Sequence, residues 1–217
     1  RKWGKTEMLI YSLFRTCMLN PKQFCYYIAP FKDQIKDLVW SNDRLPFFLP
    51  QKMMEKYGIK VNNSDFRVSF RNGSFIKCDG ADNYEKGRGY SATGLVVYDE
   101  FKDHNPNFHD GFEPNLSITD APLMIIGTPP DASEDSFQRW CSIADEALHS
   151  PVGFHIQMPS MTNPHISKEF FSRKEEELRA KGEYWKWQKE YLAMRVRAAG
   201  NNIFPMLSPD KHIKQYR

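Results

Sequence analysis

The 217-residue chain carries 30 Lys and Arg residues against 27 Asp and Glu residues, so its formal net charge is only +3. That excess permits contact with nucleic acid but is too small to indicate a protein that coats a polyanion. The four cysteines show no C-x-x-C spacing, and no apolar run reaches the roughly 18 to 20 residues that cross a bilayer, so we expect a soluble intracellular protein without a zinc site or a membrane span.

The chain begins with a candidate phosphate-binding loop. The Gly-Lys-Thr sequence at 4–6 matches the end of the pattern G-x-x-x-x-G-K-[ST], whose first glycine would fall just before Arg1. Residues 7–19 carry apolar side chains at helical spacing and lead to Asn20-Pro21, so a helix is expected directly after the loop. The strand that normally leads into such a loop is expected ahead of Arg1.

Strands and helices alternate in the next part of the chain. The aromatic-rich stretch 23–30 predicts a short strand, and residues 31–40 return to helical spacing. Residues 66–80 alternate apolar and polar side chains on both sides of Asn72-Gly73, a dipeptide typical of two-residue hairpin turns. We therefore predict a β-hairpin there.

Two later apolar runs end in polar residues. Residues 94–98 lead into Asp99 and Glu100, and residues 121–126 lead into Gly127-Thr128 and two prolines. Runs without alternation are typical of strands covered on both faces, so we predict two central parallel strands.

The C-terminal third is expected to be mainly helical. Residues 133–148 predict a helix capped by Ser133, and residues 153–161 predict a further strand. Residues 167–194 predict two helices divided at Gly182.

The candidate loop and the first of these runs supply the parts of a nucleoside triphosphatase. Gly4, Lys5 and Thr6 provide backbone N–H groups at a helix start, a lysine for the phosphate oxygens and a hydroxyl for Mg²⁺. Asp99 stands where an acid would reach the Mg²⁺ shell, and Glu100 stands where a neighbouring carboxylate would polarise the attacking water. Either motif alone is weak, but the two together, in this context of helix and strand, favour a site for ATP and Mg²⁺.

Thr128 lies at the end of another predicted strand, where ligands of parallel sheets bind. A polar side chain there is placed to sense the γ-phosphate or the catalytic water. The alternative is a proline-rich turn without such a role.

These elements predict the α/β class: a P-loop NTPase of the RecA/ASCE-like kind, with a mainly parallel central sheet flanked by helices and a small helical lid. We expect residues 1–165 to form the P-loop ATPase core, residues 166–195 the helical lid region and residues 196–217 a C-terminal linker.

The motif set resembles the ATPase domain of viral large terminase subunits, the motors that pump DNA into procapsids. The resemblance spans nearly the whole chain and rests on Arg1-x-x-Gly4-Lys5-Thr6, "YYIAP", "GLVVYDEF", "IIGTPP", "NPHISKEFF" and "EYWKWQKEYLA". The Walker A variant with Arg at its first position and the Thr-Pro motif are fairly specific to this family, whereas many helicases share the acidic Walker B motif.

The resemblance implies roles for the matching residues of the loop and the first acid. Lys5 would contact the phosphates of ATP, within a loop that also contains Arg1 and Gly4. Thr6 and Asp99 would hold Mg²⁺.

The resemblance also implies roles in hydrolysis and coupling. Glu100 would be the catalytic carboxylate, and Thr128 would couple hydrolysis to movement. Such motors use an arginine finger, worth about 10³ to 10⁵ in rate in characterised systems. Arg88, 12 residues before Glu100, is one candidate and Arg1 is another; an Arg between two glycines is equally compatible with contact to DNA or solvent.

Partners and location follow from the same resemblance. It implies that the protein acts on double-stranded DNA, forms a homo-oligomeric ring, and has a portal protein and a small terminase subunit as partners. It also implies that the protein works in the host cell cytoplasm and not at a membrane. Family members usually end with an RNase H type nuclease domain, but only about 20 residues follow the last predicted helix. We therefore expect ATP hydrolysis and no nuclease activity.

Two alternatives stay open. A superfamily 2-like helicase or translocase ATPase shares the Walker motifs, although it expects a second RecA-like domain and a Ser-Ala-Thr motif after the acids, whereas Ser91–Thr93 precedes them. The other alternative is a non-catalytic docking fragment of a packaging complex.

Two further groups of residues are expected to have structural roles. Residues 103–110 hold two Asp and two His residues whose spacing matches no helical ligand pair, so we predict a solvated loop and no metal cluster. Trp185, Trp187 and Tyr191 are expected to pack within the helical region, with stacking on bases as the alternative.

Overall fold

The structure is a computed structural model that describes residues 3–40, 44–130 and 134–196. The chain divides into two compact units, a sheet unit up to Gly127 and a helical unit from Thr128 onward. The structure thus groups residues 128–165 with the last helices, and the division expected at residue 165 stays a prediction. No helix of the described ranges is long and apolar enough to cross a membrane.

The sheet unit alternates strands and helices along the chain. Its helices are α1 (Lys5–Leu19), α2 (Gln34–Leu38), α3 (Arg44–Phe48), α4 (Gln51–Tyr57), α5 (Tyr84–Gly87) and α6 (Pro106–Thr119), with a 3-10 turn, η1 (Phe101–Asp103). Its strands are β1 (Phe24–Ala29), β2 (Lys60–Asn62), β3 (Arg67–Ser69), β4 (Phe75–Gly80), β5 (Val96–Tyr98) and β6 (Leu123–Ile125).

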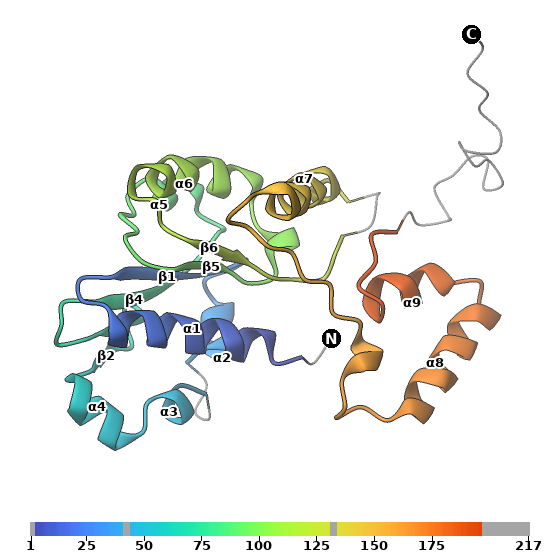
Figure 1. The fold of residues 1–217 in the computed structure, drawn as a ribbon, viewed down its shortest axis with the longest axis horizontal. Helices are drawn as coiled ribbons and strands as arrows, with labels where there is room; N and C mark the ends of the chain where they lie inside the picture. Colours follow the sequence, from blue (N-terminus) through green and yellow to red (C-terminus); the bar gives the residue numbers. More distant parts are fainter. Residues whose placement is uncertain (1–2, 41–43, 131–133, 197–217) are drawn as a thin grey trace, which may run out of the picture. The chain divides into compact units, whose positions relative to one another are not determined.

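The described strands form one six-stranded sheet in the order β2-β3-β4-β1-β5-β6 (Figure 1). Strands β4, β1, β5 and β6 run parallel, while β2 and β3 extend one edge in antiparallel fashion. Strands β1 and β5 have neighbours on both sides and are buried almost throughout, as expected for β5. Strand β6, predicted as a second central strand, is instead the edge strand of the described sheet and is only half-buried. The mainly parallel α/β sheet is therefore confirmed.

The β3–β4 hairpin is confirmed, but its turn is longer than expected. The N–H of Gly73 donates to the carbonyl of Phe70 (3.1 Å), and the N–H of Phe70 donates to the carbonyl of Ser74 (2.9 Å). Residues 70–74 connect the two strands, and of these only Gly73 takes a positive φ (85°), so the connection is not the predicted two-residue turn. The Asn72 side chain is used elsewhere, because its Nδ2 donates to the carbonyl of Cys17 (2.8 Å) near the end of α1.

Helices cover both faces of the sheet, with α1 and α2 on one face and α5 and α6 on the other (Figure 1). The buried side of α1 packs on β1 and β4 through Leu9, Ile10, Leu13, Phe14 and Cys17. On the opposite face, Tyr26 of β1 stacks on Tyr90 (4.7 Å between ring centroids) and contacts Phe112 of α6. Neighbouring residues of β1 thus point to opposite faces of the sheet and pack against different helices.

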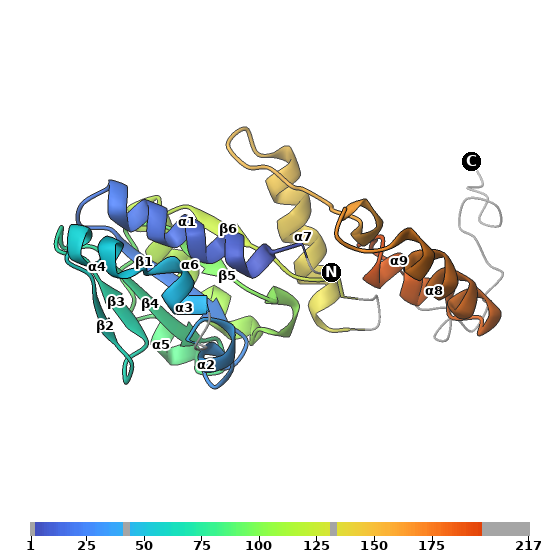
Figure 2. The same cartoon turned by 90° about the horizontal axis from the view of Figure 1, so that it is seen from below.

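The helical unit contains α7 (Ser136–His149), a 3-10 turn η2 (Ser160–Thr162), α8 (Lys168–Ala180) and α9 (Tyr184–Glu190). Helices α8 and α9 lie side by side (Figure 2) around the buried side chains of Phe171, Leu178 and Trp187. Gly182, with a φ of 68°, separates them, so the two predicted helices are confirmed. Trp187 is 1% exposed and stacks on Tyr191 (4.6 Å), which confirms the expected packing role of both rings.

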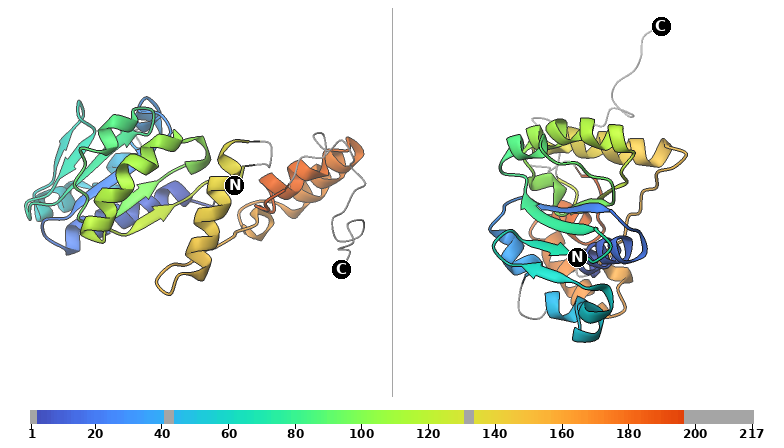
Figure 3. Two further views of the ribbon diagram at one scale, coloured as in Figure 1. Left: turned by 90° about the horizontal axis from the view of Figure 1, so that it is seen from above. Right: turned by 90° about the vertical axis from the view of Figure 1, so that its left-hand side faces the viewer.

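The strand predicted over residues 153–161 is wrong. The segment between α7 and α8 has no strand (Figure 3). Its alternating apolar side chains, such as Phe154 and Ile156, are exposed. A strand needs a neighbouring strand for its backbone groups, and none of the described strands pairs with this segment. The helix expected over residues 31–40 is also shorter, and the predicted cap Ser133 lies outside the described residues.

Candidate nucleotide-binding site

The carboxyl end of β5 places two acids at one edge of the sheet. Asp99 and Glu100 directly follow β5, and the N–H of Asp99 donates to the carbonyl of Ile28 on neighbouring β1 (2.9 Å). This bond fixes the Asp99 backbone to the centre of the sheet. Open α/β sheets bind their ligands at this edge.

The two predicted motifs meet at this edge. Thr6, in the first turn of α1, donates a hydrogen bond of 2.9 Å from Oγ1 to Asp99 Oδ2, across 93 positions of sequence. Asp99 is only 2% exposed, so this contact is not a chance encounter on the surface. The structure therefore brings the Gly4-Lys5-Thr6 turn and the Asp99-Glu100 pair together.

Gly4 gives α1 a beginning that suits an anion. It is the N-cap residue, with a φ of 66° and a ψ of 29°, a left-handed conformation in which glycine avoids the strain of a Cβ. Because glycine has no side chain, Gly4 itself makes no side-chain hydrogen bond to this end of the helix. Backbone N–H groups at a helix start, together with the helix dipole, favour a bound phosphate.

Lys5 adds a positive charge to the same turn. Its side chain is half-buried, and within the described part of the chain it has no hydrogen bond or ion pair. An ammonium group beside a helix start that is not paired with a carboxylate is suited to phosphate oxygens.

Tyr27 of β1 is a site residue that the sequence did not identify. Its hydroxyl donates a hydrogen bond of 2.6 Å to Asp99 Oδ2, the oxygen that also accepts from Thr6. Burial, with the nearby negative charge of Asp99, raises the pKa of Tyr27, so the phenol stays protonated and acts as a donor. The only signal in the sequence is the "YYIAP" run, which does not show which tyrosine faces α1.

Glu100 has an unusual backbone conformation. It is half-buried, with a φ of 48° and a ψ of 50°, values that cost about 1–3 kcal/mol for a residue with a side chain and that cluster at functional sites. Its N–H donates to Asp99 Oδ1 (3.0 Å), and the next N–H, of Phe101, donates to the carbonyl of Ile126 (3.1 Å). These bonds hold Glu100 at the sheet edge.

The segment after Glu100 is not a solvated loop, which corrects the prediction for residues 103–110. His104 is 5% exposed, and its Nε2 lies 2.8 Å from the carbonyl oxygen of Asp99. His109 lies in α6, where its ring contacts Phe101. The absence of a ligand-pair spacing led to the prediction of a solvated loop, but the buried backbone at the end of β5 needs polar partners. The described residues hold no cluster of three or more His, Cys, Asp or Glu residues that could bind a metal.

Thr6 and Asp99 nevertheless fit one Mg²⁺ ion. Their converging oxygens are hard ligands of the type that Mg²⁺ prefers. A Mg²⁺ site typically has one or two protein oxygens and completes its shell with water and substrate phosphates. The pair therefore fits Mg²⁺ bound together with a nucleotide.

Of the other predicted site residues, Arg88 is not brought to this point. Arg88 is exposed and follows α5; its carbonyl accepts from Asn115 Nδ2 of α6 (3.4 Å), on the face of the sheet opposite α1. Thr128 follows β6 by three positions and opens the helical unit. Arg1 lies outside the described residues.

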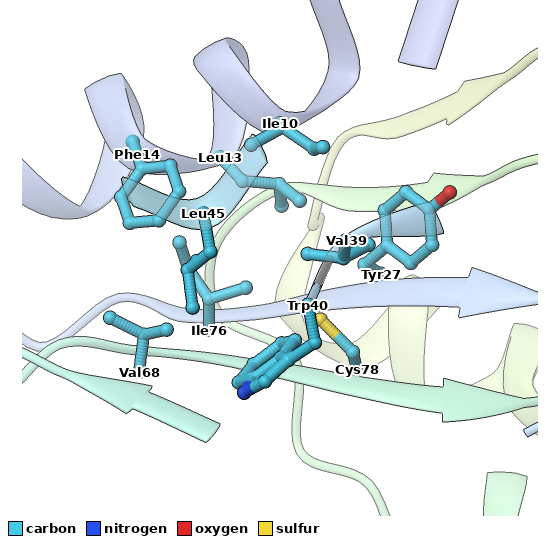
Figure 4. A pocket seen from close by; sticks show the side chains of 10 residues that line it. All are labelled: Ile10, Leu13, Phe14, Tyr27, Val39, Trp40, Leu45, Val68, Ile76 and Cys78. Atoms are coloured by element: carbon cyan, nitrogen blue, oxygen red, sulfur yellow. The ribbon is translucent and has the colours of Figure 1, made fainter. Parts of the chain in front are cut away.

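A small cavity lies under α1 (Figure 4). It measures about 10 Å³, which leaves room for one water molecule at most, and apolar side chains such as Ile10 and Val68 line it. The Tyr27 hydroxyl points away from the other side chains of this group (Figure 4). The cavity is a packing defect of the core, too small for a nucleotide.

No protein-family model matches the sequence, and no curated protein matches it. Solved structures do resemble the fold. With a TM-score of 0.65, 90% of the chain superimposes on the large terminase of a thermophilic bacteriophage, at 16% identity over 46% of that chain. The large terminase ATPase domain of Thermus phage P74-26 also gives 0.65, at 17% identity, over 90% of this chain and 86% of that one. The chain has the fold of the large terminase ATPase domain.

That P-loop fold confirms the predicted fold class. The large terminase of bacteriophage HK97 gives a TM-score of 0.63 at 17% identity, over 90% of this chain and 45% of that one. The chain thus spans about half the length of the HK97 protein and of the first large terminase described above. That first large terminase was also solved in complex with ADP and with ATP-γ-S.

Proposed function

We propose that the chain is the ATPase motor domain of a phage terminase large subunit, which hydrolyses ATP to drive double-stranded DNA into a procapsid. The observation that carries the proposal is the 2.9 Å hydrogen bond between Thr6 and Asp99, because it joins the phosphate loop to the acid-ending strand. The proposal includes a homo-oligomeric ring in the host cell cytoplasm, with a portal protein and a small terminase subunit as partners.

The residues around this bond have distinct proposed roles. Lys5 and the N–H groups that follow Gly4 bind the phosphates, and Thr6 and Asp99 hold Mg²⁺. When bound, Mg²⁺ would neutralise charge on the phosphate oxygens. Glu100 orients the attacking water and accepts its proton.

The remaining predicted residues act outside this cluster. Because Arg88 lies on the sheet face opposite α1, we propose that it serves the γ-phosphate site of a neighbouring subunit. Arg1, in the phosphate loop, is the alternative finger. Thr128 is proposed to pass the nucleotide state to the helical unit.

The helicase alternative gains no support from Ser91–Thr93. Thr93 Oγ1 accepts from the N–H of Phe24 (3.0 Å) and donates to the carbonyl of Lys22 (3.1 Å), so it anchors the start of β1. That role is structural and lies at the amino end of β1, away from Asp99.

ATP turnover by the full-length protein tests the proposal. Glu100→Gln should lower kcat about 10²- to 10⁴-fold while ATP still binds, because the variant keeps the shape of the side chain but not its basicity. Glu113→Gln removes the same charge from an exposed position of α6 and should leave turnover unchanged. Unchanged hydrolysis in Glu100→Gln would exclude the assigned carboxylate.

Calorimetry separates the motor from a docking fragment. The wild-type protein should release or absorb measurable heat on titration with a nonhydrolysable ATP analogue and Mg²⁺. A titration without any binding heat at several temperatures would support the non-catalytic alternative.

A further inference from the structure

Arg44 lies beside the proposed nucleotide site but belongs to neither motif. It is the first residue of α3, and its side chain is 35% exposed. Its Nη2 lies 3.3 Å from Glu7 Oε1, and its Nη1 donates to the carbonyl of Leu38 (2.6 Å). The guanidinium is therefore held from two sides, by a carbonyl and by a carboxylate.

Glu7 links Arg44 to the phosphate-binding end of α1. It lies in the first turn of the helix, and its second oxygen, Oε2, is 3.8 Å from the position that a Cβ on Gly4 would occupy. The carboxylate thus folds back toward the helix start. The Arg44 charge also reaches Tyr27, where it partly opposes the rise of the pKa of that phenol. Arg44 thus contacts Glu7 at the start of α1, and its charge also acts on Tyr27, the donor to Asp99.

The position of Glu7 has an electrostatic consequence. A carboxylate near a helix N-terminus is stabilised by the helix dipole, but it repels a polyphosphate that approaches the same N–H groups. A guanidinium binds carboxylate and phosphate with the same planar, two-pronged geometry. Arg44 can therefore exchange one of these anions for the other.

Building on the function proposed above, we propose that Arg44 is a phosphate-binding residue that Glu7 holds in place until nucleotide arrives. When the phosphates bind, Arg44 exchanges the Glu7 carboxylate for phosphate oxygens. The Leu38 carbonyl keeps the guanidinium near the site during the exchange.

Binding titrations of the full-length protein test this exchange, with Mg²⁺-ATP and Mg²⁺-tripolyphosphate as the two probes. Arg44→Ala should weaken both about 10- to 100-fold, the usual effect of losing a hydrogen bond to a charged group. Glu7→Gln should tighten both about 2- to 5-fold, because it removes a partly exposed competitor. Arg15→Ala is the matched control, since it removes the same charge from an exposed position of α1.

The outcomes distinguish this inference from the proposed function. If the wild-type protein binds neither probe, the function itself fails. If the wild type binds and Arg44→Ala matches Arg15→Ala, the inference alone is wrong. Weaker binding of ATP with unchanged binding of tripolyphosphate would assign Arg44 to the base or ribose and would also overturn it.

A second variant covers the case in which Arg44→Ala does not fold. Arg44→Lys keeps the charge but loses the paired hydrogen bonds, so both probes should bind with intermediate affinity. Its nucleotide-free unfolding temperature should stay close to that of the wild type, because partly exposed ion pairs contribute little to stability. Wild-type affinity for both probes in Arg44→Lys would contradict the paired contact.

Discussion

Replacing Tyr27 by Phe tests how the protein holds Asp99. The Tyr27 hydroxyl donates a 2.6 Å hydrogen bond to Asp99 Oδ2, and both residues are buried. The phenol acts as a donor because burial and the Asp99 charge raise the pKa of Tyr27. Phe keeps the ring, so the substitution removes the hydrogen bond and little else.

The expected loss follows from the charge of the acceptor. A hydrogen bond to a charged group contributes about 1.5–3 kcal/mol to the free energy of unfolding. Thr6 still donates to the same oxygen, so Asp99 is not left without a donor. In a chain of this size, each kcal/mol corresponds to about 2–4 °C, so the unfolding temperature should fall by about 3–12 °C.

Urea unfolding followed by circular dichroism measures this loss. Tyr11→Phe is the matched control, because the Tyr11 side chain is 58% exposed on α1 and should contribute little. The midpoint for Tyr27→Phe should fall while the slope with urea stays constant. Equal midpoints for Tyr27→Phe and Tyr11→Phe would refute the reasoning, since Asp99 would then be held by Thr6 and the backbone alone.

Two further substitutions test the start of α1 and the surface of α8. Gly4→Ala places a Cβ on a residue with a φ of 66° and should lower the free energy of unfolding by about 1–2 kcal/mol. Scanning calorimetry measures this loss, and an unchanged unfolding temperature would mean that the turn relaxes without strain. Hydrogen bonds from Lys174 and Lys181 lower the pKa of Glu177 from its ordinary 4.5 to about 2, so its contribution to stability is complete above pH 4.5 and is lost as the pH falls toward 2. Glu177→Gln should therefore flatten that part of the acid unfolding curve, measured by far-ultraviolet circular dichroism. Glu176→Gln, at an exposed position, is the control. A flattening of equal size in Glu176→Gln would contradict the role given to Glu177.

The elements with short-range signals could be predicted from the sequence. Helix α1 follows from apolar spacing after Gly-Lys-Thr, and β5 follows from an apolar run that ends in two acids. The start of α1 and the end of β5 could be expected to meet, because the carboxyl ends of parallel strands share one edge of a sheet. The 2.9 Å contact between Thr6 and Asp99 is consistent with that expectation.

Tyr27 could not be found in the same way. Strand β1 is buried almost throughout, so its sequence gives no alternation that would tell which face each tyrosine occupies. Tyr26 packs toward α6 and Tyr27 toward Asp99, a difference that depends on the pairing of β1 with β5. The alternation of apolar side chains over residues 153–159 led to a wrong prediction for the opposite reason. An alternating pattern predicts a strand only where a neighbouring strand is available to pair with it.

The two oxygens of Asp99 connect the proposed metal ligands to the proposed catalytic carboxylate. Oδ2 accepts from Thr6 and Tyr27, while Oδ1 accepts from the N–H of Glu100. Because both oxygens belong to one planar group, a ligand that moves Oδ2 also moves the acceptor that supports the Glu100 backbone. That backbone is in a left-handed conformation, whose free-energy cost the surrounding contacts must offset. A cation shared by Thr6 and Asp99 would therefore act on the position of Glu100 through a single side chain, without any longer pathway.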